Sequence, residues 1–444
     1  MRISIFGLIW ISLILIALTK ETKYMIYLVI ASFVFQPAWV FIIAGKDINC
    51  SLVTCSVFIL TYAMKHRKFI FSKLCKSMMI YSGYTLFISV VAPLLFSGLV
   101  ITSMSNDGYN FNYFDTDVLG LSFSNITQPL SILLYSFTAV LLYSYCRNVE
   151  WAWFDKFFIR IFVFVWLVGM LHFVLVNVGL PITILRELFH NEYVIWGASI
   201  FDGAGGGDGF CHFMSTFAEP SYCGGYLSMC LMYFLSGDHK RKKELIGMVL
   251  IALILNMSST GFATACIGIF IYILIAIRNN KINNKFLVGI ISYAIVGIIC
   301  IVLIPGLGDA IYIKTIGKAS TGSAKLRNIN NMFCWDVFIK TYGIGAGLNT
   351  VVSYSLVFAL LSQIGVIGTL LYIFFVLNVY GALGRINNKT IRNQVFYLLT
   401  CSIVASVLSC SALNLCFFWQ AICMIAIAVS SNDKRDSKHL KRII

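Results

Sequence analysis

Apolar runs separated by short polar breaks recur along the whole chain. A membrane-spanning helix needs about 20 mainly apolar residues, and about twelve or thirteen runs approach this length. The pattern therefore predicts an all-α polytopic membrane protein, with a single integral membrane domain over residues 1–444. The predicted spans cover residues 3–19, 24–44, 48–64, 78–103, 128–146, 157–179, 213–236, 245–258, 261–277, 286–304, 353–380, 394–411 and 414–430.

Two of these assignments need a separate argument. Residues 245–277 are too long for one span and have basic residues on both sides, so we expect a helical hairpin that turns near residues 258–261. The run at 3–19 is not followed by a clean small-residue cleavage site, so we interpret it as a span and not as a secretory signal.

Composition agrees with the membrane prediction. Hydrophobic residues make up 59% of the chain and charged residues 11%, with a mean hydropathy of +0.87. An ordinary soluble domain has about 25% charged residues. The 14 cysteines lie mostly inside apolar runs, without the paired spacing of a metal site or a disulfide framework. We therefore expect neither a metal nor another cofactor.

The net charge of +15 is explained by topology. Lys and Arg cluster in the short breaks between spans, which is the positive-inside pattern, so these breaks and the C-terminal tail 431–444 are predicted to be cytoplasmic. Attraction to anionic membrane lipids is a minor additional effect, and no nucleic acid partner is expected. The clusters lie at residues 65–76, 240–243, 278–285, 385–392 and 434–442.

Three longer segments then lie outside, as predicted periplasmic loops at 104–127, 180–212 and 305–352. The third carries basic residues on the side where they should be scarce. We expect an anionic ligand at this outer face, and the alternative is an amphipathic surface helix lying on anionic headgroups. The basic residues are Lys314, Lys318, Lys325, Arg327 and Lys340.

A glutamate precedes a proline in the stretch "MSTFAEPSYCGGY" (214–226), where an apolar run begins. Proline is well tolerated as the first residue of a helix, so we expect a helix from Pro220 to Leu235 with Glu219 at the outer mouth of the membrane. His212 lies seven residues before Glu219, and with two intervening hydroxyl residues it is expected to gather near the same mouth. Alternatively, Glu219 caps its own helix, which is compatible with a functional role.

Two glycine-rich stretches do not predict nucleotide sites. "GAGGGDG" (203–209) lacks the Lys-Ser/Thr of a P-loop, so we interpret it as a flexible loop. "GIGAGLN" (343–349) does not follow a strand of a βαβ unit, so we interpret it as a tight turn that returns the chain to the membrane at Val351. Its backbone N–H groups remain candidates for contact with an anion.

Four short motifs, in a fixed order, resemble those of one family. Over roughly residues 200–375 the chain resembles the bacterial O-antigen polymerases of the Wzy type, which are related to the O-antigen ligases. The resemblance implies transfer of a growing glycan from undecaprenyl diphosphate onto a new lipid-linked oligosaccharide repeat unit, at the periplasmic face of the cell inner membrane. A separate chain-length regulator protein is expected from the family alone. The motifs are "FAEPSYCGGYL" (217–227), "NMSSTGFATACIGIF" (256–270), "GSAKLRN" (322–328) and "YGIGAGLN" (342–349).

The resemblance also implies how the diphosphate is bound. Arg327 matches the outer-loop arginine of the family and is expected to stabilise the departing diphosphate. The family often has an arginine where this chain has His212, so His212 is expected to carry a proton, or the binding role has moved to Arg186. Assistance is expected from Lys325, Lys318 and Lys314, and the glycines that match the family are Gly343, Gly345 and Gly347.

The acceptor hydroxyl must lose a proton during transfer. Glu219 is the leading candidate for the base, and His212 is the alternative. Ser221, Tyr222 and Asn349 are the candidates for binding the acceptor sugar. The transfer is expected to be metal-independent, because basic side chains supply the positive charge.

Two other functions compete with the polymerase. A ligase of the related group would be expected to have a histidine in the long outer loop, and residues 305–352 contain none. A lipid-linked oligosaccharide flippase would be expected to carry more ionisable residues deep in its spans, where Arg160 and His172 are the main examples here. The concentration of polar residues in outer loops favours chemistry at the membrane surface.

Overall fold

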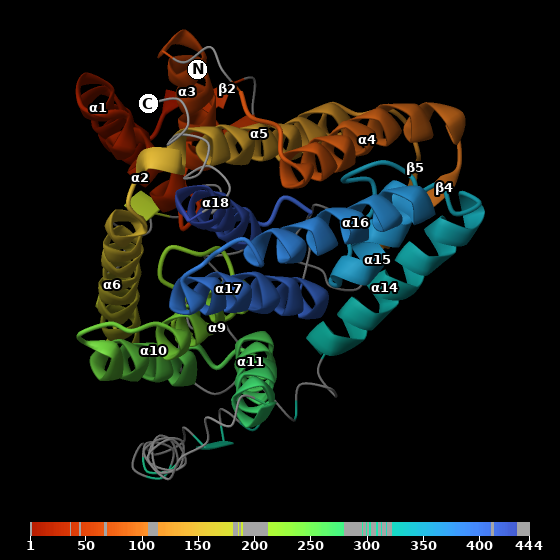
Figure 1. The fold of residues 1–444 in the computed structure, drawn as a ribbon. Helices are drawn as coiled ribbons and strands as arrows, with labels where there is room; N and C mark the ends of the chain where they lie inside the picture. The colour runs from red at the N-terminus through yellow and green to blue at the C-terminus, as the bar shows by residue number, and fades with distance from the viewer. Residues whose placement is uncertain are drawn as a thin grey trace.

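A computed structural model gives the fold of the chain (Figure 1). It describes residues 2–35, 37–43, 46–65, 69–104, 114–180, 212–278, 322–409 and 413–432, together with isolated positions between 181 and 321. Helices account for most of the described chain, as predicted. Two small antiparallel β-structures, which the apolar pattern did not predict, accompany them.

Within this part of the chain, six helical segments are long and apolar enough to cross a membrane. Three shorter apolar helices are α1 (Ile5–Thr19), α3 (Cys50–Lys65) and α18 (Cys416–Ser431). The remaining helices are α2 (Thr22–Ser32), α9 (Pro220–Ser236), α10 (Lys242–Asn256), α14 (Gly322–Lys340) and the short η1 (Cys146–Asn148). The six long segments are α4 (Lys73–Leu95), α5 (Ser124–Tyr145), α6 (Trp151–Asn177), α11 (Ser259–Arg278), the combined segment of α15 (Leu356–Ala359), η3 (Leu360–Ile364) and α16 (Gly365–Leu383), and α17 (Lys389–Leu408).

The predicted span 24–44 is wrong. Helix α2 ends at Ser32, and the chain then forms strand β2 (Trp39–Ile43), which lies between β1 (Arg2–Ile3) and β3 (Lys46–Asn49). The Ser4 hydroxyl joins this sheet to α1, because it donates to the Trp39 carbonyl at 2.6 Å and also caps the first turn of α1. The run from Trp39 to Ile43 is rich in β-branched and aromatic residues, which favour a strand once a partner is present.

The predicted span 78–103 is also too long. Helix α4 ends at Leu95, and residues 100–104 form strand β4 (Val100–Met104), which pairs with β5 (Phe114–Val118). The break predicted within 245–277 is confirmed, because α10 and α11 are separate helices joined through a left-handed turn residue, Met257 (φ 50°). They do not form the predicted hairpin, since the two helices lie at a steep angle to each other and pack on α9 (Figure 1). Of the predicted span 286–304, only residues 295, 299 and 302 belong to the described chain.

Contacts between helix termini divide the bundle into two ends. One end, here the basic end, holds the termini near Lys65, Lys73, Lys242 and Lys389, as contacts between residues beside these termini show. There the Ser430 hydroxyl of α18 bonds the Tyr143 carbonyl of α5. The opposite end, here the Glu219 end, holds the start of α9 and the α10–α11 turn. In Figure 1, α4, α5, α16 and α17 run across the view, and β4, β5 and α14 lie beyond one end of them.

Helices α9 and α18 lie in the core. Nearly every residue of both helices is buried, including Tyr226 and Tyr233 of α9 and Trp419 of α18. A helix that is apolar all round is expected to be surrounded by other elements. The Glu219 end of α9 therefore begins a helix that is buried along nearly its whole length.

Candidate functional site

The start of α9 is where the sequence predicted it. Glu219 is the N-cap residue and Pro220 the first helical residue. The Glu219 carboxylate accepts a hydrogen bond from the Ser221 hydroxyl at 2.9 Å and makes no capping bond to the backbone of α9. The alternative that Glu219 caps its helix by hydrogen bonding is therefore not supported, although its charge still lies at the positive end of the helix dipole.

Asn256, the last residue of α10, fixes the two segments that carry the predicted site residues. Its side-chain amide donates to the carbonyls of Phe213 (2.6 Å) and Pro220 (3.0 Å). Its own backbone carbonyl accepts a hydrogen bond from Nδ1 of His212 at 2.8 Å. His212 and the first residue of α9 are thus attached to the same asparagine, so His212 lies close to the start of α9.

A close crossing of α9 and α11 sets the position of this group. A Cβ atom on Gly224 would lie 2.9 Å from the Cα atom of Gly261 and 2.7 Å from Oδ1 of Asn256. The Ser228 hydroxyl lies at the same crossing, 2.8 Å from the carbonyls of both glycines. Only glycine permits backbones to approach this closely. The first two sequence motifs therefore form one packed unit.

The two hydroxyl residues between His212 and Glu219 have anchoring contacts. Ser215, with a left-handed φ of 53°, donates to the Val165 carbonyl of α6 at 2.5 Å. Thr216 donates to the Val34 carbonyl at 2.6 Å. Both side chains are buried. They hold the segment before α9 in the core, and the expectation that they join His212 and Glu219 in an open polar group is not supported.

Tyr354 links the two ends of the predicted site. The guanidinium of Arg327, on α14, lies 5.3 Å from the centre of the Tyr354 ring. The Tyr354 backbone N–H is bound by Asn331, also on α14, at 3.3 Å. Burial raises the pKa of Tyr354, the Glu219 carboxylate raises it further, and the Arg327 guanidinium lowers it. Glu219 and Arg327 therefore act on the same phenol from distant parts of the sequence.

The segment that carries Arg327, which the sequence predicted to be an outer loop, is a helix from Gly322 to Lys340. The first turn of α14 contains Lys325, and its last turn contains Lys340, which pairs with Asp336 on the surface at 2.7 Å. An apolar stripe of α14 is exposed, formed by Met332, Trp335 and Ile339. This stripe supports the interpretation of the segment as a surface helix. Arg327, on the same helix, is partly buried beside Tyr354.

The glycine turn after α14 does not bind an anion through its backbone. The N–H groups of Ala346 and Gly347 donate to the carbonyls of Ser362 and Gln363, and the N–H of Leu348 donates to the Ser89 hydroxyl of α4. The remaining N–H groups between residues 343 and 349 also donate to protein acceptors. The candidate anion contact is thus wrong, because tertiary packing uses these donors.

The same turn has a positioning role instead. Left-handed φ angles occur at Gly343 (76°), Gly345 (89°) and Gly347 (95°), which explains the glycines. The buried Gln363 side chain accepts from the Asn349 N–H at 3.4 Å and donates to the Val351 carbonyl at 2.9 Å. These bonds fix the chain between the turn and Tyr354.

The other predicted residues fall into three groups. Tyr222 is buried, and its ring lies 6.5 Å from that of Phe417 on α18, which is a packing position. Asn349 is exposed and lines a cavity described below. Arg186, Lys314 and Lys318 lie outside the described residues, as does the side chain of Lys325.

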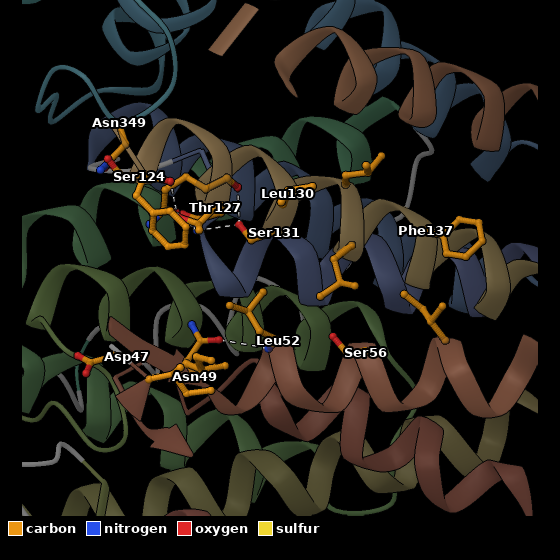
Figure 2. Close-up of a pocket in the computed structure, with 18 of the residues that line it drawn as sticks. Asp47, Asn49, Leu52, Ser56, Ser124, Thr127, Leu130, Ser131, Phe137 and Asn349 are labelled. Atoms are coloured by element: carbon orange, nitrogen blue, oxygen red, sulfur yellow. Dashed lines mark hydrogen bonds between the residues drawn. The ribbon is translucent and has the colours of Figure 1, made fainter. Parts of the chain in front are cut away.

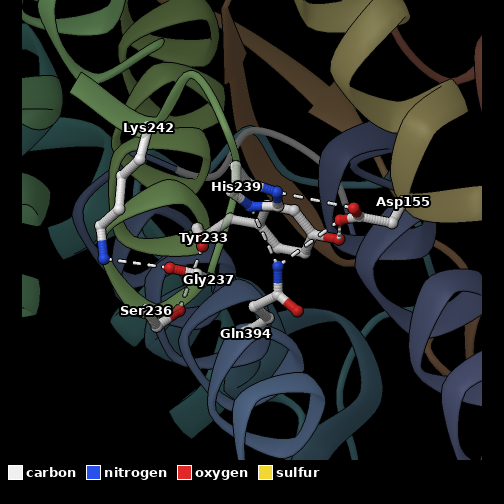
Figure 3. Close-up of polar contacts among 7 residues, drawn as sticks. All are labelled: Asp155, Tyr233, Ser236, Gly237, His239, Lys242 and Gln394. Atoms are coloured by element: carbon white, nitrogen blue, oxygen red, sulfur yellow. Dashed lines mark hydrogen bonds and ion pairs between the residues drawn. The ribbon is translucent and has the colours of Figure 1, made fainter. Parts of the chain in front are cut away.

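A second polar cluster lies at the basic end of α9 (Figure 3). The Asp155 carboxylate of α6 accepts from the Tyr233 hydroxyl at 2.6 Å and lies 3.5 Å from Nδ1 of His239. Gln394 of α17 lies between them, 3.1 Å from Nε2 of His239 and 3.5 Å from Asp155. Lys242 binds the final carbonyls of α9. These groups bind one another, so the cluster holds α6, α9 and α17 together.

No protein-family model matches the sequence, and a comparison with curated proteins finds no significant match. Sequence reasoning missed Asn256 and Tyr354 at the Glu219 end. Asn256 lies inside the second motif, at the polar break between α10 and α11, and this position could have identified it from the sequence. For Tyr354, the only feature in the sequence was its place shortly after the glycine turn.

Proposed function

We propose that the chain is an O-antigen polymerase, a glycosyltransferase that joins undecaprenyl-diphosphate-linked oligosaccharide repeat units at the periplasmic face of the inner membrane. The observation that carries the proposal is the convergence of Glu219 and Arg327 on Tyr354. A carboxylate and a guanidinium at one mouth, without an ion pair between them in the described structure, leave both groups available to a substrate.

Arg327 suits the departing group. Cleavage of the anomeric C–O bond leaves the electron pair, and hence negative charge, on the diphosphate of the lipid carrier. A guanidinium stabilises such charge by paired hydrogen bonds. The Tyr354 ring lies beside this guanidinium, which restricts its orientation. Because burial raises its pKa, the Tyr354 phenol remains protonated at neutral pH.

Glu219 suits the acceptor. As the acceptor oxygen forms the new glycosidic bond to the anomeric carbon, its proton passes to a base. The Glu219 carboxylate, oriented by the Ser221 hydroxyl, is the leading candidate. His212 remains the alternative, since Nδ1 donates to the Asn256 carbonyl and Nε2 is then the basic nitrogen of the neutral ring. One glycosidic bond thus forms as the anomeric C–O bond to the diphosphate breaks, and the diphosphate leaves with its polyprenyl chain.

The gel pattern of surface lipopolysaccharide tests the proposal in cells. Deletion of the gene should leave single repeat units without a long ladder. Glu219→Ala and Arg327→Ala, expressed at the normal level, should reproduce this pattern. Glu244→Ala, exposed in the first turn of α10, and Lys340→Ala, on the same helix as Arg327, are matched controls that should keep the ladder.

The same gel separates the alternatives. Loss of even the single-unit band in the deletion strain would indicate a flippase. Free polymer that is not attached to lipid A-core would indicate the ligase. Full-length ladders from both Glu219→Ala and Arg327→Ala would refute the site assignment.

A further inference from the structure

A cavity of about 1160 Å³ lies between α3, α4 and α5, apart from the group around Tyr354 (Figure 2). It is as large as the pockets that hold small-molecule ligands. Nineteen described residues line it, and neither Glu219, Arg327 nor Tyr354 is among them. Nine of the nineteen carry hydrogen-bonding side chains, so the lining is amphipathic.

The part of the lining that α5 contributes becomes apolar along the helix, because four of its first five residues are polar and its last three are apolar. Eight residues of α5 line the cavity, namely Ser124, Thr127, Gln128, Leu130, Ser131, Leu133, Leu134 and Phe137. Their order begins at the Glu219 end and extends about 20 Å along the helix axis, since 13 residues separate the first from the last. Figure 2 shows Ser124 and Asn349 at one end and Phe137 at the other.

The polar residues of α5, together with Asn349 and Asn414, carry neutral groups that both donate and accept. Asn414 donates from its amide to Gln128 (2.6 Å) and to Ser131 (3.2 Å), which fixes three lining side chains from two segments. Asn349 adds an exposed amide, on a backbone held by Gln363. Amides and hydroxyls arranged in this way complement the hydroxyl groups of a sugar.

The charge of the lining excludes a phosphate. Asp47 is the one charged side chain among the described residues that line the cavity, and none of them is Lys, Arg or His. The described lining therefore offers a phosphate no cationic side chain. In this respect the cavity is the opposite of the Arg327 region.

We infer that the cavity is a second binding site, for an amphiphile whose uncharged, hydroxyl-rich sugar contacts the amides while its hydrocarbon chain contacts Leu134 and Phe137. The inference does not depend on the proposed transfer reaction. Asn349 is five residues from Tyr354, so the polar end lies within about 18 Å of that residue along the chain. A bound sugar therefore lies next to the proposed transfer site.

Photolabelling of the purified protein in lipid nanodiscs tests the inference without turnover. The probe is dodecyl maltoside that carries a diazirine at the end of its alkyl chain. We expect labelled peptides from α3 and α5. Unlabelled dodecyl maltoside should compete at least about tenfold better than dodecyl phosphate, which has the same chain and an anionic head. Equal competition by the two would overturn the inference, because the polar end would then have no selectivity.

Variants distinguish labelling of this cavity from nonspecific labelling of exposed helix faces. Leu134→Trp fills the apolar end and should abolish labelling of α5, whereas Leu370→Trp, on the exposed face of α16, should not. Thr127→Val replaces one hydroxyl of the lining by a methyl group and keeps the shape of the side chain, so dodecyl maltoside should bind about three- to tenfold more weakly. Thr369→Val on α16 is the matched control and should leave this binding unchanged. Unchanged labelling in Leu134→Trp would refute the site, whatever the lipopolysaccharide gel shows.

Discussion

Replacement of Gly224 by alanine tests the packed unit on which the site depends. The new Cβ atom would lie 2.9 Å from the Cα atom of Gly261, and ordinary contact begins at 3.4 Å, so α9 and α11 must separate by about 0.5 Å. The neighbouring atoms are backbone and a buried amide, which cannot rotate away. Overpacking of this kind costs about 1–3 kcal/mol.

The separation of α9 from α11 should also lower the proposed activity. Separation of α9 from α11 weakens the bond from Ser228 to the Gly261 carbonyl and displaces Asn256, which holds both Pro220 and His212. A displacement approaching 1 Å at reacting groups lowers rates by about 10²-fold. We therefore expect a loss of polymerisation larger than the loss of folded protein.

The assay has two parts. Denaturant titration of the purified protein in micelles measures the free energy of unfolding, and the lipopolysaccharide ladder measures activity. Gly247→Ala in α10 and Gly381→Ala in α16 are controls, because a Cβ atom at either position meets nothing within 4 Å. Both should be neutral or slightly stabilising, as expected for alanine inside a helix. A Gly224→Ala protein as stable and active as these controls would refute the proposed close crossing.

Two further predictions concern single polar groups. Tyr354→Phe keeps the ring beside Arg327 and removes the phenol, so polymerisation should fall about tenfold with little change in stability near neutral pH. The pKa of Tyr354 in the folded protein is raised above 10.0, so the stability that its protonated phenol contributes is present below pH 10 and is lost as the pH rises through this folded-state pKa. The free energies of unfolding of the wild type and of Tyr354→Phe should therefore change relative to each other only in that alkaline range. A difference that already changes near pH 7 would contradict the raised pKa. Asp155→Ala leaves the buried Tyr233 hydroxyl without its acceptor and should reduce the free energy of unfolding by about 1–3 kcal/mol. The control Asp336→Ala removes an exposed ion pair with Lys340 and should change the free energy of unfolding by less than about 0.5 kcal/mol. Equal effects of the two substitutions in denaturant titration would show that the Asp155 cluster does not stabilise the fold.

The helical part of the fold could be predicted from hydropathy, because a membrane helix satisfies its own backbone and needs only a long apolar run. The same rule failed at residues 39–43. There the apolar run forms a strand whose partners, Arg2–Ile3 and Lys46–Asn49, cannot be identified from local pattern. A strand depends on its neighbours, and periodicity does not name them.

The site could be predicted only in part for a similar reason. Pro220 marked the start of α9, and the glycines at 343–347 marked a turn, because both residue types constrain the backbone locally. The partners of that turn, Ser89 and Gln363, come from elsewhere in the chain and reverse the interpretation of its N–H groups. Tyr354 acquires its position from the same long-range contacts.

The central claim is that Glu219 and Arg327 act in one reaction. It is tested most directly by the rate at which purified protein joins a synthetic undecaprenyl-diphosphate-linked repeat unit. Glu219→Ala and Arg327→Ala should each lower the rate by at least about 10²-fold, and the double variant should be no slower than the worse single variant, because groups that act as a unit are not additive. Single variants with wild-type rates, or losses that multiply in the double variant, would contradict the account.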